Sequence, residues 1–381
     1  MGLPEVEGAT VKITSVETFA VRVDMAVPRG PSILSYRARE SLFIKIQTDS
    51  GLVGWGKTYC VAGVEAAIRD VLAPMLVGQD PLEGRRLRQQ MLLATFENGF
   101  AVGGVDLALH DVWGKALGVP IHVLYGGALR LQLEPYASLP GYHDDKGPED
   151  HWFAEVAELA AAGLKGVKLR IGRFPPAREL PILARIRETL PKDVKLMADG
   201  NAAYSSGPAL EVARALAELG FGWFEEPLPQ SGYLGYPELR AKCALPLAGG
   251  ESLATRIQGH ELLNRGCFDI IQPDVSICGG IAECLFIGEL ARLHAVRCIP
   301  HCWGGGVMLA ATLQVAALLP DVSRLAGGDP PLVELDVTEN PFRTTLLVGD
   351  PFVLRNGYIS LPSGPGLGIE VDESVLTRYA A

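Results

Sequence analysis

The sequence of 381 residues lacks the features that mark several classes of protein. Positive charge is in deficit: 34 lysine and arginine residues face 44 acidic ones, giving a formal net charge of −10, whereas nucleic acids and anionic membranes favour basic surfaces. No apolar run is long enough to cross a bilayer. We therefore expect neither nucleic acid nor a membrane as a partner.

Cysteine pairs and targeting signals are also lacking. The seven cysteines are odd in number and form no CxxC pair, and most stand beside apolar residues, as in CFDIIQP and RCIPHC. That pattern is typical of reduced, buried thiols in the cytosol. Residues 1–16 show no basic segment followed by an apolar one, and Val6 stands where a myristoylation signal needs serine or threonine. We expect a cytoplasmic protein without a signal peptide.

What is present is an ordinary globular composition, 48% hydrophobic and 20% charged, in a chain long enough for two or three domains. Residues 11–23 and 41–56 alternate apolar and polar side chains and predict strands, whereas residues 63–118 carry apolar side chains at helical spacing. Residues 24–40, rich in Pro, Gly and Arg, predict a long loop, either a lid over a site or a surface hairpin. Residues 1–131 therefore form a predicted α+β domain.

From about residue 132 the pattern changes to an alternation of strands and helices. The short apolar runs are LEPYAS, GVKLRI, VKLMAD, GWFEE, LPLAGGE, FDIIQPD and RCIPH, with LVELD at 332–336 as an eighth. Eight such units predict a (β/α)₈ barrel over residues 132–340, an α/β fold. An open doubly wound sheet is the alternative, but no GxGxxG follows a first strand. Residues 341–381 carry short strand-like runs and are expected to pack back on the N-terminal domain.

Catalytic groups of such barrels lie where the strands end. Three consecutive predicted strands end in acids, Asp199, Glu225 or Glu226, and Glu251, with 26 residues from Asp199 to Glu225 and again to Glu251. Neighbouring strands lie about 4.8 Å apart, so three carboxylates at one height repel one another unless a cation joins them. Mg²⁺ prefers oxygen ligands and keeps positions open for water or substrate. The spacing predicts a magnesium site, without deciding between Glu225 and Glu226.

The ends of the other predicted strands carry groups suited to proton transfer. Asp274 and His301 end the next two strands, where the carboxylate can fix the imidazole tautomer and leave its other nitrogen free as a general base. Lys168 and Arg170 alternate out of the second strand, so both side chains face the same way. Two cations facing a carboxylate cluster can bind an anionic substrate and stabilise a developing enediolate.

Together these residues resemble a known family. The motifs VKLRI, MADGN, WFEEP, GGES, QPDVSICGG and IPHCWGG stand in the order and at the spacing of the enolase superfamily, in its mandelate racemase subgroup, over nearly the whole chain. The resemblance implies a barrel covered by a capping domain built from both chain ends, with residues 24–36 closing the site. It also implies one Mg²⁺ and proton abstraction next to a carboxylate.

The resemblance assigns roles to individual residues. It makes Asp199, Glu225 and Glu251 the metal ligands, His301 and Asp274 the base and its partner, and Lys168 and Arg170 the strand-two pair. It places an acid near the substrate carboxylate on the eighth strand, for which Glu334 is the candidate. It also makes Asn201 a polar neighbour of the site. We expect substrate contacts from Asn201, Trp303 and Arg29, and loop position suggests Arg29, Tyr36, Arg37 and Lys57 as contacts to the distal end of the substrate.

One residue departs from the family pattern. The racemases of this subgroup carry a lysine base where this sequence has Arg170, and arginine stays protonated and is a poor base. We therefore expect abstraction by His301 followed by β-elimination from a sugar acid or its lactone, by a Mg²⁺-dependent dehydratase or cycloisomerase. A racemase or epimerase that uses His301 and a strand-two base is the alternative, and a barrel that only binds a ligand is a third. We expect a small anionic carboxylate as substrate and a homo-oligomeric assembly.

Overall fold

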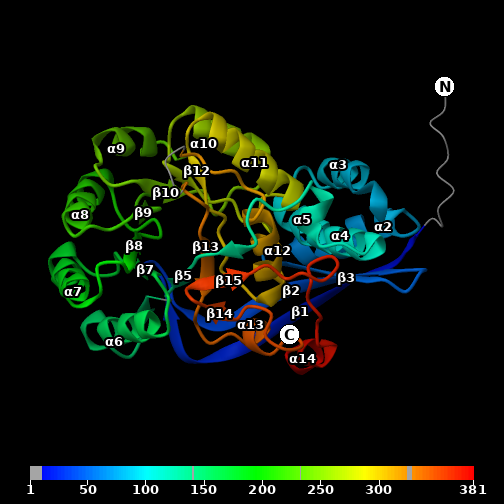
Figure 1. The fold of residues 1–381 in the computed structure, drawn as a ribbon, viewed down its shortest axis with the longest axis horizontal. Coiled ribbons are helices and arrows are strands. Elements are labelled where there is room, and N and C mark those ends of the chain that lie inside the picture. The colour runs from blue at the N-terminus through cyan, green and yellow to red at the C-terminus, as the bar shows by residue number, and fades with distance from the viewer. Residues whose placement is uncertain (1–10, 140, 232, 324–327) are drawn as a thin grey trace.

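The computed structural model describes residues 11–139, 141–231, 233–323 and 328–381. Three sheets organise this part of the chain: a four-stranded antiparallel sheet, an eight-stranded parallel sheet and a three-stranded antiparallel sheet. Helices surround the parallel sheet, and the antiparallel sheet with its own helices lies beside it (Figure 1). Residues 1–10, on which part of the targeting argument rests, lie outside the described residues.

The capping sheet is built on a long hairpin. Strands β1 (Ile13–Gly30) and β2 (Tyr36–Thr48) pair with each other, β3 (Val53–Thr58) pairs with β2, and β6 (Tyr142–His143) pairs with the far end of β1. The expectation of a loop over residues 24–40 is wrong for most of that segment, because the two strands run into it and leave only residues 31–35 between them. Segment β6, far along the chain, supplies the hydrogen-bonding partner that extends β1.

The helices of the capping region cover one face of this sheet. Their core consists of buried aliphatic side chains such as Ile44, Ile68, Leu72 and Val105. A π-helical turn at Ala67–Leu72 joins the first two helices. The elements are α1 (Val64–Ala66), α2 (Ala73–Leu76), η2 (Pro81–Glu83), α3 (Gly84–Ala94), α4 (Gly99–Leu117) and α5 (Ile121–Leu124).

The parallel sheet curls into the predicted barrel, and the fold class is confirmed. Its strands, in spatial order, are β12 (Arg297–Cys298), β11 (Ile270–Ile271), β10 (Leu247–Gly249), β9 (Phe224–Glu225), β8 (Lys195–Asp199), β7 (Gly166–Arg170), β5 (Pro135–Ser138) and β13 (Val333–Asp336). The helices between them are α6 (Pro148–Ala161), α7 (Pro176–Thr189), α8 (Ser206–Glu218), α9 (Tyr236–Lys242), α10 (Arg256–Asn264), α11 (Ile281–Leu293) and α12 (Gly306–Ala316). In the described residues, no ladder joins β12 to β13.

A separate cluster of apolar side chains comes from several of these barrel strands and their flanks. Tyr136, Met197, Trp223, Ala248 and Ile270 belong to it, all of them buried. Such side chains make the barrel a packed core and not a pore, which confines a ligand to the end of the barrel where the strands terminate.

The C-terminal segment contacts both regions. Strands β14 (Leu354–Arg355) and β15 (Tyr358–Ser360) form the third sheet with β4 (Gln132–Leu133), and two short helices, α13 (Pro341–Thr344) and α14 (Glu373–Arg378), flank them. The last residues return to the capping strand β1, since the Ala381 amide donates to the Ala20 carbonyl at 2.9 Å and Arg22 donates to Tyr379 at 2.8 Å.

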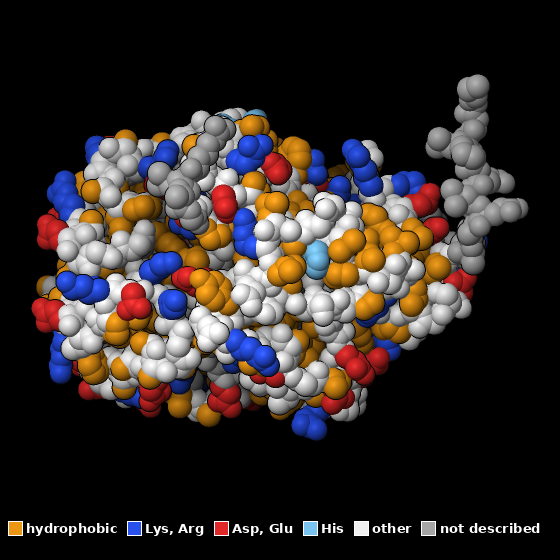
Figure 2. All heavy atoms as spheres, viewed as in Figure 1, with side chains coloured by type: hydrophobic (Ala, Val, Ile, Leu, Met, Phe, Trp, Pro, Cys, Tyr) orange, Lys and Arg blue, Asp and Glu red, His pale blue; other side chains and the backbone are white. Residues whose placement is uncertain are grey.

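The surface and the thiols agree with the composition. Charged side chains of both signs are interspersed over the barrel side of the face in Figure 2. Five of the seven cysteines are buried as expected, but Cys60 is exposed and Cys243 is partly so. No helix in the described ranges is both long enough and apolar enough to pass through a membrane.

Helix α4 and strand β3 approach each other closely enough to require glycine. A Cβ atom at Gly56 would lie 2.0 Å from the carbonyl oxygen of Gly104. We expect Gly56→Ala to lower the free energy of unfolding by about 3 kcal/mol or more, because the helix must move away from the sheet. Urea denaturation measures this. Gly84→Ala is the control, since a Cβ there meets no heavy atom within 4 Å, and equal loss in both variants would contradict the explanation.

Candidate active site

Some of the predicted site residues line one cavity of about 310 Å³ between the barrel and the cap, whereas Lys168, Asp199, Glu225, Asp274 and Glu334 are buried and do not line it. Its floor comes from the ends of barrel strands, with Arg170, Glu251 and His301 among the lining residues. Its roof comes from the hairpin of β1 and β2, including Pro31 and Tyr36. The hairpin tip is fixed to the barrel, because the Ser32 hydroxyl donates to the Gly200 carbonyl at 2.9 Å.

Lys168 is the buried cation around which three acids gather. Its ammonium contacts Glu225, lies 2.9 Å from Oε1 of Glu334 and 3.7 Å from Oδ2 of Asp199. Burial acts to lower the pKa of Lys168, but the charges of Glu225 and Glu334 outweigh it and raise the pKa well above its ordinary value. The lysine is therefore charged at neutral pH, and it holds together carboxylates that would otherwise repel one another.

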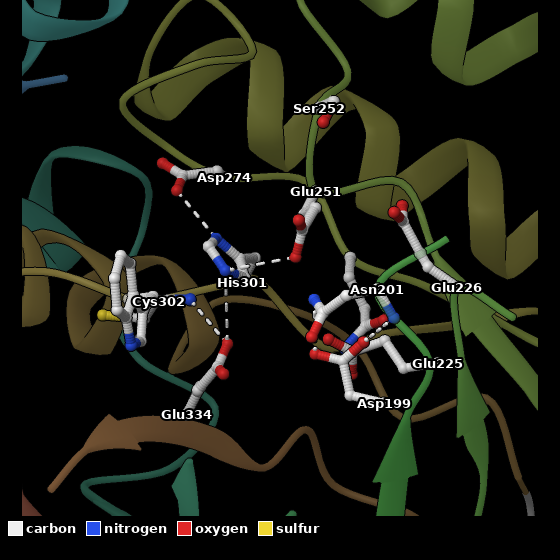
Figure 3. A network of polar contacts seen from close by, with 12 residues as sticks. Asp199, Asn201, Glu225, Glu226, Glu251, Ser252, Asp274, His301, Cys302 and Glu334 are labelled. Carbon is white, nitrogen blue, oxygen red and sulfur yellow. Dashed lines mark hydrogen bonds and ion pairs between the residues drawn. The ribbon is translucent and has the colours of Figure 1, made fainter. Parts of the chain in front are cut away.

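The structure separates Glu225 from Glu226. Glu225 faces Lys168 and also accepts hydrogen bonds from Gln272, at 2.8 Å, and from the Trp223 indole, at 3.2 Å. Glu226 has a left-handed backbone, with φ of 33°, and points elsewhere (Figure 3). It accepts from Gln230, from the Tyr233 hydroxyl and from the Gly250 amide. Burial and the charge of Glu251 raise the pKa of Glu226 to about 8.

The third strand of the barrel contributes Asp199 and its neighbour Asn201. Asn201 also has a left-handed backbone, with φ of 42°, which lets its amide donate to Oδ1 of Asp199 at 2.9 Å while its side chain donates to Oδ2 at 3.1 Å. The side-chain oxygen of Asn201 is buried without a hydrogen-bond partner. Burial raises the pKa of Asp199, and the charge of Glu251 adds to the rise although Lys168 and Arg170 oppose it.

These residues fit a hard divalent cation by their chemistry. Asp199, Glu225 and Glu251 offer only oxygen, burial raises the pKa of both Asp199 and Glu225, and the unpaired oxygen of Asn201 lies beside them. The carboxylate oxygens of the three acids are farther apart than expected. They are not among the groups of ligating side chains, within the described ranges, whose donor atoms lie within 4.8 Å of one another. Lys168 contacts two of them, and Glu251 turns toward His301.

His301 and Asp274 form a pair on the opposite side of the site. Nδ1 of His301 lies 2.9 Å from Oδ2 of Asp274, and Nε2 lies 3.4 Å from Glu251 and 3.8 Å from Glu334 (Figure 3). Asp274 is held in turn by the Tyr59 hydroxyl, at 2.9 Å. Burial acts to lower the pKa of His301, but Glu334, Glu251 and Asp274 together raise it to about 10. The imidazole is ready to accept a proton only when some of that negative charge is neutralised.

Glu334 links the eighth strand to the site, as expected for an acid at that position. One of its oxygens accepts from the Cys302 amide at 3.0 Å, and the other faces Lys168. Burial acts to raise the pKa of Glu334, but Lys168 and His301 hold it well below its ordinary range. The side chain is therefore a permanent anion between the base and the lysine.

Arg170 and Trp303 form one wall of the cavity. The guanidinium of Arg170 lies 5.0 Å from the centre of the Trp303 ring, and that of Arg39 lies 4.1 Å from it. Burial acts to lower the pKa of Arg170, but Asp199 and other anions outweigh it and the pKa is raised. Arg170 therefore stays charged and serves the site as a cation.

The cap contributes two of the four residues expected and others that were not expected. Tyr36 and Lys57 line the cavity, but Arg29 and Arg37 are not among its lining residues. Arg29 instead pairs in register with His143 of β6, because β1 extends past the cavity. Arg39 and Tyr59 also line the cavity, and neither was expected from the sequence. Nothing in their local sequence sets them apart, since their partners Asp336 and Asp274 lie more than 200 residues away.

Comparison with known proteins places the chain in a family. Residues 13–126 match the mandelate racemase / muconate lactonizing enzyme N-terminal domain, and residues 152–375 match the enolase C-terminal domain-like family. The chain belongs to the mandelate racemase / muconate lactonizing enzyme family of the enolase superfamily, as the sequence motifs indicated. Its relatives are lyases and isomerases, so the expectation of an enzyme in one of these two classes is confirmed.

Among the relatives, the chain is 35% identical to D-galactarolactone cycloisomerase from Agrobacterium fabrum, with 97% of this chain and 99% of that protein covered. It is 32% identical to arabinonate dehydratase from Saccharolobus solfataricus, covering 91% and 92% respectively. Among solved structures, 3,6-anhydro-D-galactonate cycloisomerase from Zobellia galactanivorans is 31% identical with a TM-score of 0.87, covering 97% of this chain and 99% of that one.

Lys57 is a buried cation whose exposed fraction is 1%. Its ammonium lies 3.4 Å from the centre of the Tyr59 ring and 3.7 Å from the sulfur of Met308. Burial lowers the pKa of Lys57 to about 8, although the charge of Asp274 opposes the change. The folded protein therefore holds a charged lysine at neutral pH against the effect of its surroundings.

This burial predicts a stability change with a defined pH dependence. Below pH 8 the lysine is protonated in both the folded and unfolded states, and the depressed pKa corresponds to a cost on the order of 3 kcal/mol. We expect Lys57→Met to raise the free energy of unfolding at pH 7, with the gain shrinking as the pH rises from 8 to 10.5. Urea denaturation across this range measures it. Exposed Lys192→Met should show no gain, and a destabilised Lys57→Met protein at pH 7 would refute the argument.

Proposed function

We propose that this enzyme removes the proton next to the carboxylate of a sugar acid or its lactone and then eliminates the β-oxygen. The observation that carries the proposal is the position of His301. Its Nδ1 is hydrogen bonded to Asp274, and the residue lines a cavity shared with Arg170, Asn201 and Glu251. A base aligned in this way and facing cations is suited to abstracting a weakly acidic C–H proton.

The charges of the neighbouring residues favour elimination over racemisation. A two-base racemase needs a second group that can lose its proton on the face opposite His301. Lys168 and Arg170 are the candidates, and nearby anions raise the pKa of each. Both therefore act as fixed cations that hold the substrate carboxylate and stabilise the enediolate, which leaves His301 as the base.

Asp199, Glu225 and Glu251 are the residues that would hold a divalent cation, for which Mg²⁺ is the proposed identity. When bound, the cation supplies positive charge that offsets these carboxylates, which brings the pKa of His301 down toward neutrality and favours an enediolate. A solved enolase-superfamily structure of the same fold, L-talarate/galactarate dehydratase from Salmonella typhimurium, is described as liganded with Mg and L-lyxarohydroxamate.

The reaction then proceeds through groups of this chain. Nε2 of His301 takes the α-proton, and the electron pair of the C–H bond passes into the enediolate, which Lys168 and Arg170 stabilise. The electrons return to form a C=C bond while the β C–O bond breaks, and the resulting enol becomes a 2-keto acid. In an open-chain acid the leaving oxygen needs a proton, which His301 returns to it. In a lactone it leaves as a carboxylate with a pKa of about 4 and needs none.

The cavity suits a small polyhydroxylated anion. It is about 310 Å³ in volume, close to the lower end of ordinary ligand sites, and Arg39, Lys57 and Tyr36 provide polar groups on the cap side. The relatives described above are named for galactarolactone, arabinonate and anhydrogalactonate, all of them sugar acids or their cyclic forms. We propose that the cap cations contact the end of the substrate farther from the abstracted proton.

The proposed reaction should give a detectable product, and substitution of His301 should slow its formation. Incubation with Mg²⁺ and a set of aldonic acids, aldaric acids and their lactones in D₂O should give α-deuterium exchange or a 2-keto acid, both visible by NMR. His301→Asn should lower the rate by about 10²-fold or more, since it replaces the imidazole base by a smaller amide that cannot accept the proton. His294→Asn, at an exposed histidine on the protein surface, should be fully active.

Two outcomes would count against this assignment. Undiminished exchange in His301→Asn would show that another group is the base. Exchange with inversion at the α-carbon and without a 2-keto product would favour the racemase alternative.

The adjacent glutamates give a matched test of the cation site. We expect Glu225→Gln to weaken Mg²⁺ binding, measured by calorimetry, by more than the roughly 10-fold that loss of an outer-shell partner causes. Glu226→Gln should bind nearly as well, because Glu226 is bound to Gln230, Tyr233 and Gly250. The reverse order of affinities would assign the ligand to Glu226 instead.

A further inference from the structure

A second group of metal-binding side chains lies outside the candidate active site. His143 stands on β6, and His151 and Glu155 stand one turn apart on α6. One donor atom from each lies within 4.8 Å of the other two. The two imidazole rings are 4.0 Å apart between centres and inclined by 52°. The arrangement brings two nitrogens and a carboxylate toward a common point.

The hydrogen bonds of this group are incomplete. Oε1 of Glu155 lies 3.0 Å from Nε2 of His143 and 3.3 Å from Nδ1 of His151. Nδ1 of His143, both nitrogens of His151 and Oε2 of Glu155 are nevertheless buried without a hydrogen-bond partner. His143 and His151 are only 7% and 3% exposed. Buried polar atoms in native proteins are almost always paired, so four unpaired atoms in one cluster indicate a missing partner.

We propose that His143, His151 and Glu155 form a binding site for a transition-metal ion such as Zn²⁺. Two imidazoles and one carboxylate make up a ligand set well suited to Zn²⁺, whereas Mg²⁺ prefers oxygen alone. Asp145 lies at the other edge of the same imidazole, its exposed carboxylate 3.8 Å from Nδ1 of His143, where it can orient the ring as an outer-shell partner. This site differs in donor chemistry from the carboxylate site of the barrel.

The position of the site gives the metal a structural role. Strand β6 pairs with the tip of β1, where Arg29 lies opposite His143 and Gly30 lies opposite Tyr142. The next residue, Pro31, lines the active-site cavity. A metal that joins β6 to α6 therefore fixes the strand on which the roof of the cavity is supported. In Figure 1 the hairpin of β1 and β2 reaches past β5 toward α6.

Cobalt provides a direct test on the full chain. The protein, freed of metal with a chelator and then saturated with Mg²⁺, is titrated with Co²⁺. We expect one equivalent to bind with the visible ligand-field absorption of a nitrogen-ligated site. Zn²⁺ should displace it and abolish the band. Glu225→Gln should keep the band, because that variant alters only the carboxylate site.

Substitutions separate this site from other histidines. His151→Gln and Glu155→Gln should each weaken Co²⁺ binding by about 100-fold, whereas His260→Gln, at an exposed histidine of α10, should leave it unchanged. Circular dichroism checks that each variant is folded, and Glu155→Gln serves if His151→Gln is not. The absence of the band in the native protein, or its full retention in both variants, would overturn the proposal.

Discussion

The electrostatic interaction on which the site depends is the contact of one buried ammonium group with several buried carboxylates. Lys168 touches Glu225 and Glu334 and lies near Asp199, all of them almost wholly buried. Charges of one sign are brought to the same end of the barrel by parallel strands, because every strand terminates there. Without a cation among them, most of these carboxylates would have to be protonated.

The balance of charges also explains which residues stay protonated in the site. Lys168 and Arg170 on β7 stay protonated because acids surround them. In the proposed reaction they can attract the carboxylate of the substrate, but they cannot accept the proton from its α-carbon. Nearby acids also act on His301, because the negative charges of Glu334, Glu251 and Asp274 raise the pKa of its imidazole. In the proposed function, Arg170 in place of the lysine base expected from the family resemblance leaves one base, His301, in the same barrel.

Much of the barrel and its site could be predicted because local patterns determine them. A short buried strand that ends in Asp199, or that closely precedes His301, is visible in the sequence, and the regular spacing of these strands places their ends together. Local sequence does not show which of two adjacent acids turns inward. Glu226 differs from Glu225 in its left-handed backbone and in its hydrogen bonds with Gln230 and the Gly250 amide.

Contacts between the barrel and the cap were harder to predict. The β1 hairpin looked like a loop because β6, the strand that extends it, lies more than 100 residues away. Arg39 and Tyr59 have ordinary surroundings in the sequence and become part of the site only through Asp336 and Asp274. Arg29 was misplaced for the same reason, since an extended strand carries it beyond the cavity toward His143.

Within the part of the chain that the structure describes, no ladder joins β12 to β13, and this has a consequence for the barrel. Between these two strands a side chain provides a hydrogen bond in place of a ladder. One oxygen of Glu334 accepts a hydrogen bond from the Cys302 amide, and the other faces Lys168. Glu334, which joins the two end strands of the barrel sheet, is thus also a residue of the candidate active site. A substitution that removes the carboxylate of Glu334 would therefore remove both an acid of the site and a hydrogen bond between β13 and the segment that follows β12.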